Sequence, residues 1–460
     1  MPTLTHHLLR ALSILPAAAL ATSLQAASSS RLSDEPVPMQ TEGFPERPAP
    51  IIELGQNPFL GNGYIAPGFT TPTGAVWQPL FIVYGTMRSA LQTFDAGGPA
   101  GETSEWANRL DLFGNLYLTP TERILIGFRP LDEDGEFSGY RFSSPEDDVD
   151  RTNSRIQTLF MEGDFGELFP FLDPLDGKSL DYGFSVGRQP LSFQKGILIN
   201  DNIDAIGITR SSLFLFGASA FRATALYGWN EIHRGDNREA NDTKLYGLLM
   251  AADYDQTSFE IDTLYTESSL ASGGDQWNGG ITMTRRIRHL NVSLSANASS
   301  ALDEEADTGA TGDGTLLVGQ FSFTPPYTED LAYANLFWGI DSFRSAARGP
   351  EAGGPLGQVG ILFAAVGIGS YGAPLGNQAD ESAGGAVGYQ HFFNHTRGQL
   401  TFELGARTNT SGHSRDTIAA GARFQHALGR HLVFRADIHA SEGDERDSGY
   451  GLRSEILVKF

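Results

Sequence analysis

Hydrophobic and polar residues alternate along most of the chain after position 80. In 290–297, Leu290, Val292, Leu294 and Ala296 alternate with asparagine and serine residues. A period of two places successive side chains on opposite faces of a β-strand. The clearest segments of this kind are 110–118, 124–128, 259–265, 290–296, 400–406, 418–424 and 432–438. We predict strands there, near the roughly 9 to 11 residues that a tilted strand needs to cross a membrane.

The connections between these segments alternate in length. Short connections are predicted at 119–121, 255–256, 287–289, 394–396 and 428–430, and long polar ones at 131–152, 231–242, 301–313, 344–384 and 442–447. Transmembrane barrels of bacteria have short periplasmic turns and longer external loops. The pattern therefore predicts an all-β fold, a transmembrane antiparallel β-barrel of about 18 strands. About 16 strands is the alternative, because 165–179 and 191–202 are weakly patterned.

The segment 449–460 shows the alternation clearly and is followed by no further residue. Its apolar positions are Tyr450, Leu452, Ile456, Val458 and Phe460, and its charged positions are Arg453, Glu455 and Lys459. An edge strand of a soluble sandwich would show the same period. A terminal amphipathic strand that ends in an aromatic residue is typical of the closing strand of an outer-membrane barrel.

The first part of the chain does not show this pattern. Residues 1–26 combine Arg10, an apolar run at 11–24 and small residues at Ala26 and Ala27, which predicts a secretory signal peptide. Residues 27–78 are rich in Pro, Gly, Ser and Thr, and we predict no strand in them. They would lie in the periplasm or inside the barrel, which we expect to span 79–460.

Composition narrows the choice further. No run of 18 apolar residues follows the predicted signal peptide, so we expect no transmembrane helix. The chain has no cysteine, which excludes disulfides, haem attachment through thioethers and thiolate metal sites. Its formal charge of −23 disfavours nucleic acid as a partner, since phosphates require clustered lysine and arginine.

Taken together, the signal peptide, the alternating strands, the loop lengths and Phe460 resemble the porin-type outer-membrane barrels of Gram-negative bacteria. Within that class, FSVGRQPL at 184–191 and the segment 196–208 are similar to a strand pair of alginate-export-like 18-stranded barrels. The resemblance implies an outer-membrane location and contact with lipid and lipopolysaccharide. It also implies recognition of the strand ending in Phe460 by the barrel-assembly machinery. It leaves monomer and trimer open.

The same alternation identifies charged residues that would face the lumen. The predicted pore-lining residues are Arg109, Arg123, Arg129, Arg155, Arg222, Glu403, Arg407, Arg423, Arg435, Asp437, Arg453 and Glu455, with Asp111 and Lys459 on the same face. Basic residues outnumber acidic ones in this set. They would either guide anions through a pore or pair with one another and stiffen the wall.

The longest predicted connection, 344–384, has an apolar, glycine-rich middle at 353–374. Exposed at the surface, it would form a hydrophobic patch. We predict that it folds inward and narrows the pore, with a trimer contact as the alternative.

Metal sites and catalysis find little support. His391 and His395 would lie about 13 Å apart on a strand, too far to share one ion. The loops 132–150 and 303–313 are rich in Asp and Glu but lack the spacing of an EF-hand. We therefore favour solvent-exposed loops over calcium sites. No G-x-S-x-G nucleophile motif occurs. We expect no cofactor, no metal and no enzyme activity.

The function that the sequence favours is passive passage of small polar or anionic solutes through an outer-membrane channel. One alternative is an export conduit for a polysaccharide or a secreted product. Another is a structural or adhesive surface barrel without solute flux.

Overall fold

The computed structural model describes residues 48–55, 67–99, 101–172, 180–303, 309–412, 416–444 and 446–460. These residues belong to one compact unit, Pro45–Phe460. The predicted signal peptide lies outside the described residues.

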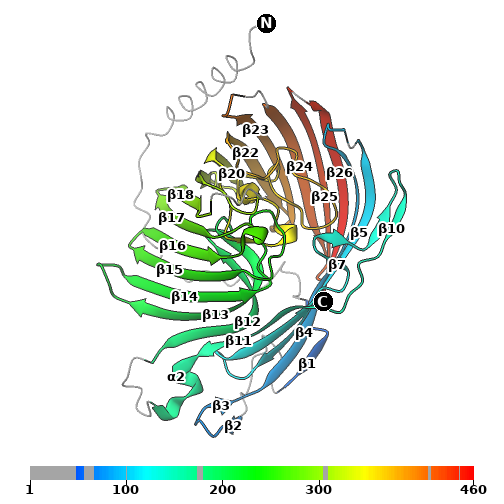
Figure 1. Cartoon of the computed structure of the whole chain (residues 1–460). Coiled ribbons are helices and arrows are strands. Elements are labelled where there is room, and N and C mark those ends of the chain that lie inside the picture. The colour runs from blue at the N-terminus through cyan, green and yellow to red at the C-terminus, as the bar shows by residue number, and fades with distance from the viewer. Residues whose placement is uncertain are drawn as a thin grey trace. The chain divides into compact units, whose positions relative to one another are not determined.

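A closed antiparallel barrel of 18 strands forms this unit (Figure 1). In chain order the wall strands are β4 (Leu80–Asp95), β5 (Thr103–Tyr117), β6 (Arg123–Phe128), β11 (Ile156–Asp164), β12 (Tyr182–Phe193), β13 (Ile199–Leu213), β14 (Ala220–Asn230), β15 (Lys244–Tyr254), β16 (Thr257–Glu267), β17 (Gln276–Ile287), β18 (Leu290–Ala301), β19 (Gly314–Phe323), β20 (Leu331–Asp341), β22 (Ser382–Phe393), β23 (Gly398–Asn409), β24 (Thr417–Leu428), β25 (Leu432–Gly443) and β26 (Arg446–Lys459). Pairing of β26 with β4 closes the wall, with Leu457 opposite Arg88. The predicted fold class is confirmed, and the alternative of 16 strands is wrong.

Short elements decorate the wall. They are β1 (Ile52–Leu54), β2 (Phe69–Thr70), β3 (Val76–Trp77), β7 (Asp132–Glu133), β8 (Glu136–Phe137), β9 (Gly139–Arg141), β10 (Asp147–Val149), β21 (Ala347–Arg348), the helix α2 (Phe165–Leu168) and the 3₁₀ turns η1 (Pro170–Leu172), η2 (Leu270–Ser272), η3 (Pro350–Ala352) and η4 (Pro355–Gln358). No helix within the described ranges is long and apolar enough to cross a membrane.

Two details of the predicted strand map are wrong. Three short strands, β1, β2 and β3, lie in the region predicted to have none, because backbone pairing with β4 and between β2 and β3 overrides the Pro/Gly-rich composition. The predicted long connection 442–447 is also much shorter, because β25 continues to Gly443 and pairs there with Arg446 of β26.

The two faces of the wall differ as the alternation predicts. On the outer face Leu452 and Ile438 are each 57% exposed, whereas Arg453 on the inner face is 1% exposed. Outward side chains of a membrane barrel contact lipid, and they are exposed when no lipid surrounds the protein. Strand parity together with burial therefore identifies the side chains that face the lumen.

The two ends of the barrel also differ. Connections such as 129–155, 231–243 and 342–381 leave one end, which we call the loop end. Connections such as 255–256 and 288–289 close the opposite end, which we call the turn end.

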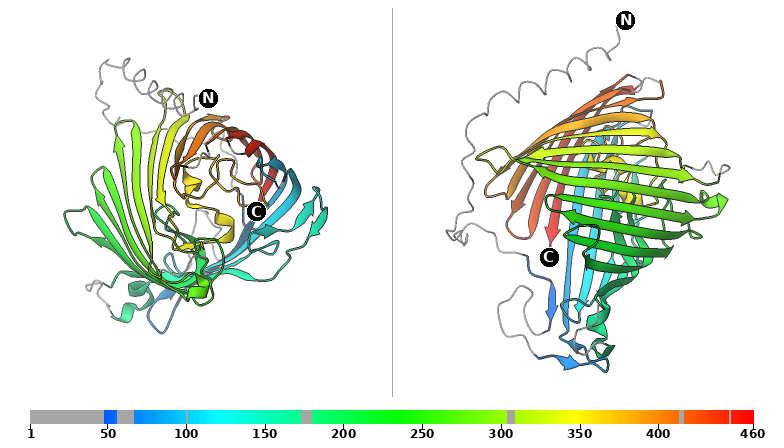
Figure 2. Two further views of the ribbon diagram at one scale, coloured as in Figure 1. Left: turned by 45° about the horizontal axis from the view of Figure 1, so that its top comes forward. Right: turned by 90° about the vertical axis from the view of Figure 1, so that its left-hand side faces the viewer.

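Two segments from the loop end lie inside the lumen. The first is the tip of the β12–β13 hairpin, 189–203, which extends beyond the pairing of β12 with β11 and of β13 with β14. The second is 342–381, seen in yellow inside the ring of strands in Figure 2. The two segments meet where Ile199 pairs in parallel with Ala347 of β21.

The hairpin leaves the wall at the GRQ motif. Gly187 has φ = 118°, and a Cβ there would lie 2.2 Å from the carbonyl oxygen of Leu159 on β11. Only glycine fits this position without strain. Arg188 then pairs with Asp204 at 2.9 Å, and Gln189 donates to the carbonyl of Ala205 at 3.0 Å. The motif thus fixes the point at which the hairpin turns inward.

A large apolar cluster fills part of the lumen. It joins wall residues to both inserted segments and includes Ile197, Leu198, Ile199, Ile203, Leu226, Leu245, Leu249, Leu264, Leu316, Val318, Phe337, Phe343, Leu356, Val359, Leu362, Phe363 and Leu375. We call these residues the apolar cluster. On this side the lumen is not lined by polar residues, because leucines take the inward positions Leu226 of β14, Leu245 and Leu249 of β15 and Leu264 of β16.

Candidate functional site

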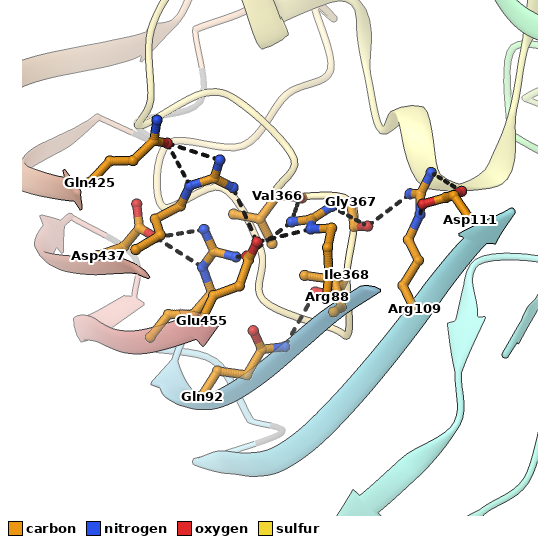
Figure 3. A network of polar contacts seen from close by, with 12 residues as sticks. Arg88, Gln92, Arg109, Asp111, Val366, Gly367, Ile368, Gln425, Asp437 and Glu455 are labelled. Carbon is orange, nitrogen blue, oxygen red and sulfur yellow. Dashed lines mark hydrogen bonds and ion pairs between the residues drawn. The ribbon is translucent and has the colours of Figure 1, made fainter. Parts of the chain in front are cut away.

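The inserted segment 342–381 crosses the lumen and is held to β4 and β5 by hydrogen bonds to its backbone. Arg88 donates to the carbonyls of Val366 (3.0 Å) and Gly367 (3.2 Å), and Arg109 donates to Gly367 at 3.0 Å. Figure 3 shows both guanidinium groups pointing at this stretch. Each arginine stands on the inward face of a rigid strand, so the position of the segment is well defined.

A network of buried charges lines the neighbouring wall (Figure 3). Glu455 is the centre: its carboxylate accepts from Arg88 at 2.9 Å and Arg435 at 3.3 Å, and from Arg453. Asp437 pairs with Arg453 at 2.6 Å and with Arg423. We call Arg88, Arg423, Arg435, Asp437, Arg453 and Glu455 the charged cluster. Four cations thus share two carboxylates.

A second group of charges lies at the loop end, beside β5 and β6. Arg129 pairs with Asp111 at 2.9 Å and with Glu351 of the inserted segment, and lies 3.6 Å from Asp132. Arg109 also pairs with Asp111, at 2.9 Å. These contacts tie the first part of the inserted segment to the wall.

The environment of the two loop carboxylates differs. Burial raises the pKa of Asp132 to about 6, although the guanidinium of Arg129 opposes this. Burial alone would also raise the pKa of Glu351, but its closer pairing with Arg129 outweighs burial and lowers that pKa.

Two further predicted residues hold the inserted segment from β23. Glu403 accepts from the backbone N–H groups of Ile361 (3.0 Å) and Leu362 (2.8 Å), and from the hydroxyl of Tyr333. Arg407 donates to the carbonyl of Leu375 at 3.3 Å. Their side chains are therefore engaged by protein groups.

The remaining predicted residues lie apart from these clusters. Arg123 pairs with Glu162, and Arg155 pairs with Glu231 in the loop-end connection 231–243. Arg222 lies on the inward face of β14 near the turn end and is exposed. The structure thus divides the predicted set into several separate sites.

Of the two interpretations of the inward charges, the contacts favour mutual pairing for most residues. Arg423, Arg435 and Arg453 each meet at least one carboxylate within 4 Å. A role for these residues in guiding solutes stays a prediction.

A cavity of about 530 Å³, lined by both polar and apolar residues, lies on the turn-end side of the inserted segment. Its wall residues come from the turn-end parts of β17 to β20, with Arg423 from β24. Gly357, Gly360, Ile361 and Ala364 of the inserted segment cover it. A second, much smaller space of about 20 Å³ lies between the inserted segment and β24 and β25. Ile361, Ala364 and Arg423 line both spaces. The two spaces therefore lie next to each other at these residues, and the smaller one has room for roughly one water.

Sequence reasoning missed three residues that shape this region. Arg88 stands on the inward parity of β4 and could have been found from it. Glu105 holds the inserted segment by accepting from the backbone N–H of Ser370 at 2.5 Å. Lys195 lines the cavity from the tip of the inward hairpin, where no alternation marks its direction.

Within the described part of the chain, no group of three or more His, Cys, Asp or Glu residues is arranged to hold a metal ion. The described side chains therefore offer no metal centre to build on.

No protein-family model and no curated protein matches the sequence. Solved structures match the fold. OccK11 (OpdR) of Pseudomonas aeruginosa aligns with a TM-score of 0.53 at 10% identity, over 83% of this chain and 96% of that one. OccK8 (OprE) of the same organism aligns with a TM-score of 0.53 at 13% identity, over 85% of this chain and 99% of that one. OccAB2 of Acinetobacter baumannii aligns with a TM-score of 0.52 at 12% identity, over 82% of this chain and 98% of that one. The chain thus has the fold of 18-stranded outer-membrane β-barrels and resembles the Occ proteins in fold.

Proposed function

We propose that this protein is an outer-membrane channel for small polar or anionic solutes, restricted by the inserted segment 342–381. The observation that carries the proposal is the cavity on the turn-end side together with the small space between the inserted segment and β24 and β25, since Ile361, Ala364 and Arg423 line both. Its fold matches the solved structures of OccK11 (OpdR) and OccK8 (OprE), at identities that support the fold alone. In the membrane the turn end would face the periplasm.

Passage would occur where the inserted segment meets β24 and β25. The lining there combines the ion pair of Arg423 and Asp437 with His439, Tyr371 and small residues such as Gly421. A charged, narrow wall selects ions by sign and size. Solutes larger than water would require displacement of this part of the segment.

Planar-bilayer recording of the purified barrel tests the proposal. We expect a small conductance that rises when residues 365–372 are replaced by two glycines, because this change removes part of the cover and leaves Phe363 and Leu375 in the apolar cluster. A barrel that passes no current in either form would overturn the channel proposal.

Charge is tested separately. Replacing Arg423, Arg435 and Arg453 by glutamine leaves Asp437 without its two arginines and Glu455 with Arg88 alone, so the reversal potential in a salt gradient should move toward cation preference. The matched control is Arg238→Gln, whose side chain is 86% exposed in the connection 231–243. Recording at low and at high salt is informative, because the Debye length falls from about 10 Å at 0.1 M to about 3 Å at 1 M.

A structural barrel without solute flux is the second candidate. The apolar cluster favours it, since wall residues and both inserted segments pack together as in the core of a soluble protein. Permeation of labelled solutes into liposomes separates the two candidates, because only the channel admits them.

A further inference from the structure

An arginine stands on the lipid-facing side of β17, near the turn end. Ile281, Met283 and Arg285 alternate with inward residues of this strand and therefore share its outer face. Ile281 is 45% exposed, whereas Thr282 is 2% exposed. Arg285 is exposed as well. A charge on the outer face is tolerated at this level, because its cost falls from the bilayer midplane toward the interface with water.

Arg285 belongs to a basic run that has no acidic partner. Residues 285–289 read RRIRH, and all five are exposed. Among the described residues, none places a carboxylate oxygen within 4 Å of a guanidinium group of this run. Arg286 donates to the carbonyl of Arg288 at 3.1 Å, which leaves the guanidinium groups of Arg285 and Arg288 without a hydrogen bond to any described residue. In a chain of net charge −23, this run is a local surplus of positive charge.

A second outward arginine near the turn end is arranged differently. Arg210 stands on the same outer face of β13 as Ile208, which is 49% exposed. It pairs with Asp181 at 3.2 Å and lies 5.0 Å from the ring centroid of Tyr182. The charge of Arg210 is thus matched within the protein, whereas the charge of Arg285 is left for a ligand.

An apolar groove of about 620 Å³ crosses the outer face from β16 to β20, beside Arg285. It lies between two rows of cross-strand neighbours, one with Ile281, Ala296 and Leu317 and the other with Met283, Leu294 and Gly319. Ala296 and Gly319 are the smallest of these residues, so the outer face is recessed between their larger neighbours. Arg285 follows Met283 on the same face, about 7 Å nearer to the turn end.

A second apolar groove, of about 490 Å³, adjoins the first on the other side of β16. Phe259 lines both grooves and lies opposite Met283 across β16 and β17. At this second groove, Phe216 of the β13–β14 turn packs edge to face on Phe221, with the ring centroids 5.8 Å apart. The two grooves therefore meet at Phe259, one outward position away from Arg285.

We propose that this face of the barrel binds one anionic phospholipid. Its phosphate would lie on Arg285, with Arg288 beside it in the turn, and its two acyl chains would occupy the two grooves that meet at Phe259. Clustered basic residues attract anionic headgroups, and apolar chains favour apolar grooves over water. A zwitterionic headgroup fits less well, because its own cation would meet the arginines of 285–289 and no carboxylate. The inference goes beyond the channel proposal and does not depend on solute flux.

Native mass spectrometry of the purified, delipidated barrel in detergent tests the site with three probes. Dioleoyl phosphatidylglycerol offers an anionic headgroup with two chains, dioleoyl phosphatidylcholine the same chains with a zwitterionic headgroup, and glycerol 3-phosphate a phosphate without chains. We expect one phosphatidylglycerol to be retained per barrel, with at least tenfold higher affinity than either other probe. Equal affinity for two of the probes that include phosphatidylglycerol, or retention of none, would overturn the proposal.

Arg285→Gln tests the headgroup contact. It should weaken phosphatidylglycerol binding to the level of phosphatidylcholine, because the unmatched charge is removed. The matched control is Arg210→Gln, which removes an outward arginine that has its own carboxylate and should leave lipid binding unchanged. Phosphatidylglycerol affinity that is insensitive to Arg285→Gln would contradict the site.

Gly319→Leu tests the larger groove. A Cβ at this position would lie 3.3 Å from the ring of Phe321 and 3.6 Å from Leu294, so a side chain is accommodated with a small shift and fills the recess. We expect phosphatidylglycerol to bind at least tenfold more weakly. Ala225→Leu, at an exposed outward position of β14 that lines neither groove, should leave binding unchanged. Full binding by the folded Gly319→Leu variant would refute the groove as the site of the chains.

The same spectra distinguish another occupant of this face, a second copy of the chain. A dimer or trimer that Gly319→Leu dissociates, with no lipid retained, would identify a contact between copies and overturn the lipid site. Heat-dependent gel mobility shows whether each variant folds. If Gly319→Leu does not fold, the comparison of headgroups and Arg285→Gln decide the proposal.

Discussion

The apolar cluster and the charged cluster hold the same inserted segment by opposite physical means. In the apolar cluster Phe363 and Phe337 pack edge to face, with ring centroids 5.4 Å apart, and both are buried. In the charged cluster Arg88 reaches the backbone of the segment directly while it pairs with Glu455. One side fixes the segment by shape, and the other by directed hydrogen bonds.

This difference indicates on which side the inserted segment can move away from the barrel wall. Apolar packing has no preferred direction, but it loses all its contacts when a gap opens. A hydrogen bond from Arg88 or Arg109 to a carbonyl can be exchanged for one to water or to a solute. We therefore expect any opening of the barrel to occur on the side of the charged cluster, where the small space beside Arg423 lies.

The largest loss of unfolding free energy should come from Glu455→Gln. This carboxylate is shared by three guanidinium groups, and its replacement leaves them buried with one charge too few. Loss of one partner from a buried ion pair costs about 3 to 5 kcal/mol. Urea unfolding in lipid vesicles measures the change in free energy. Glu442→Gln, at an exposed position of β25, should lie within about 0.5 kcal/mol of wild type.

Phe363→Ala tests the apolar side. Removal of a buried phenylalanine side chain costs about 3 kcal/mol through lost transfer energy and the cavity left behind. The same unfolding measurement applies, and Phe214→Ala at an 81% exposed turn position is the control. The two sides can also be separated by limited proteolysis of 342–381. Release of the segment in Phe363→Ala but not in Glu455→Gln would reverse the assignment of the yielding side.

Gly187→Ala tests the point where the hairpin enters the lumen. The positive φ and the close carbonyl of Leu159 make a side chain strained there, at a cost of about 1 to 3 kcal/mol. Gly429→Ala is the control, since Gly429 also has a positive φ (78°) but has open space where its Cβ would stand. If the two variants unfold at the same denaturant concentration, the close approach at Gly187 has no energetic role.

The smallest effect is a pH dependence from Asp132. Its folded pKa of about 6 lies above the ordinary value of 3.8, so the folded state holds the proton more tightly. The resulting stabilisation is complete below about pH 4 and is lost as the pH rises through 6. Asp132→Asn should remove this slope, seen as the difference between the unfolding free energies of variant and wild type across that range. A parallel pH profile for both proteins would exclude the effect.

Strand parity correctly predicted which side chains of the barrel wall face outward and which face the lumen. Leu452 and Arg453 stand on opposite faces as expected, because the lipid and the lumen demand different side chains at alternate positions. The same reasoning identified most members of the charged cluster. It could not say whether Arg423 and Asp437 would meet a solute or each other, since parity gives the face and leaves the partner open.

Strand parity could not predict that the tip of the β12–β13 hairpin folds into the lumen. Ile197, Leu198 and Ile199 are consecutive apolar residues, and all three are buried because the tip is enclosed on every side. A period of two has no meaning where both faces of a strand meet protein. The consequence was that Lys195, at the same tip, could not be assigned to the lumen from the sequence.

The short strand β1 has a consequence for solubility. Beyond the last pairing of β26, where Phe460 exchanges hydrogen bonds with Gly85, the edge of β4 would present unpaired N–H and C=O groups. β1 occupies this edge, with Ile52 opposite Val83 and Leu54 opposite Phe81. An open strand edge is a template for pairing with another chain. β1 thus covers the edge of β4 beside the closure of the barrel and protects it from pairing with a strand of another chain.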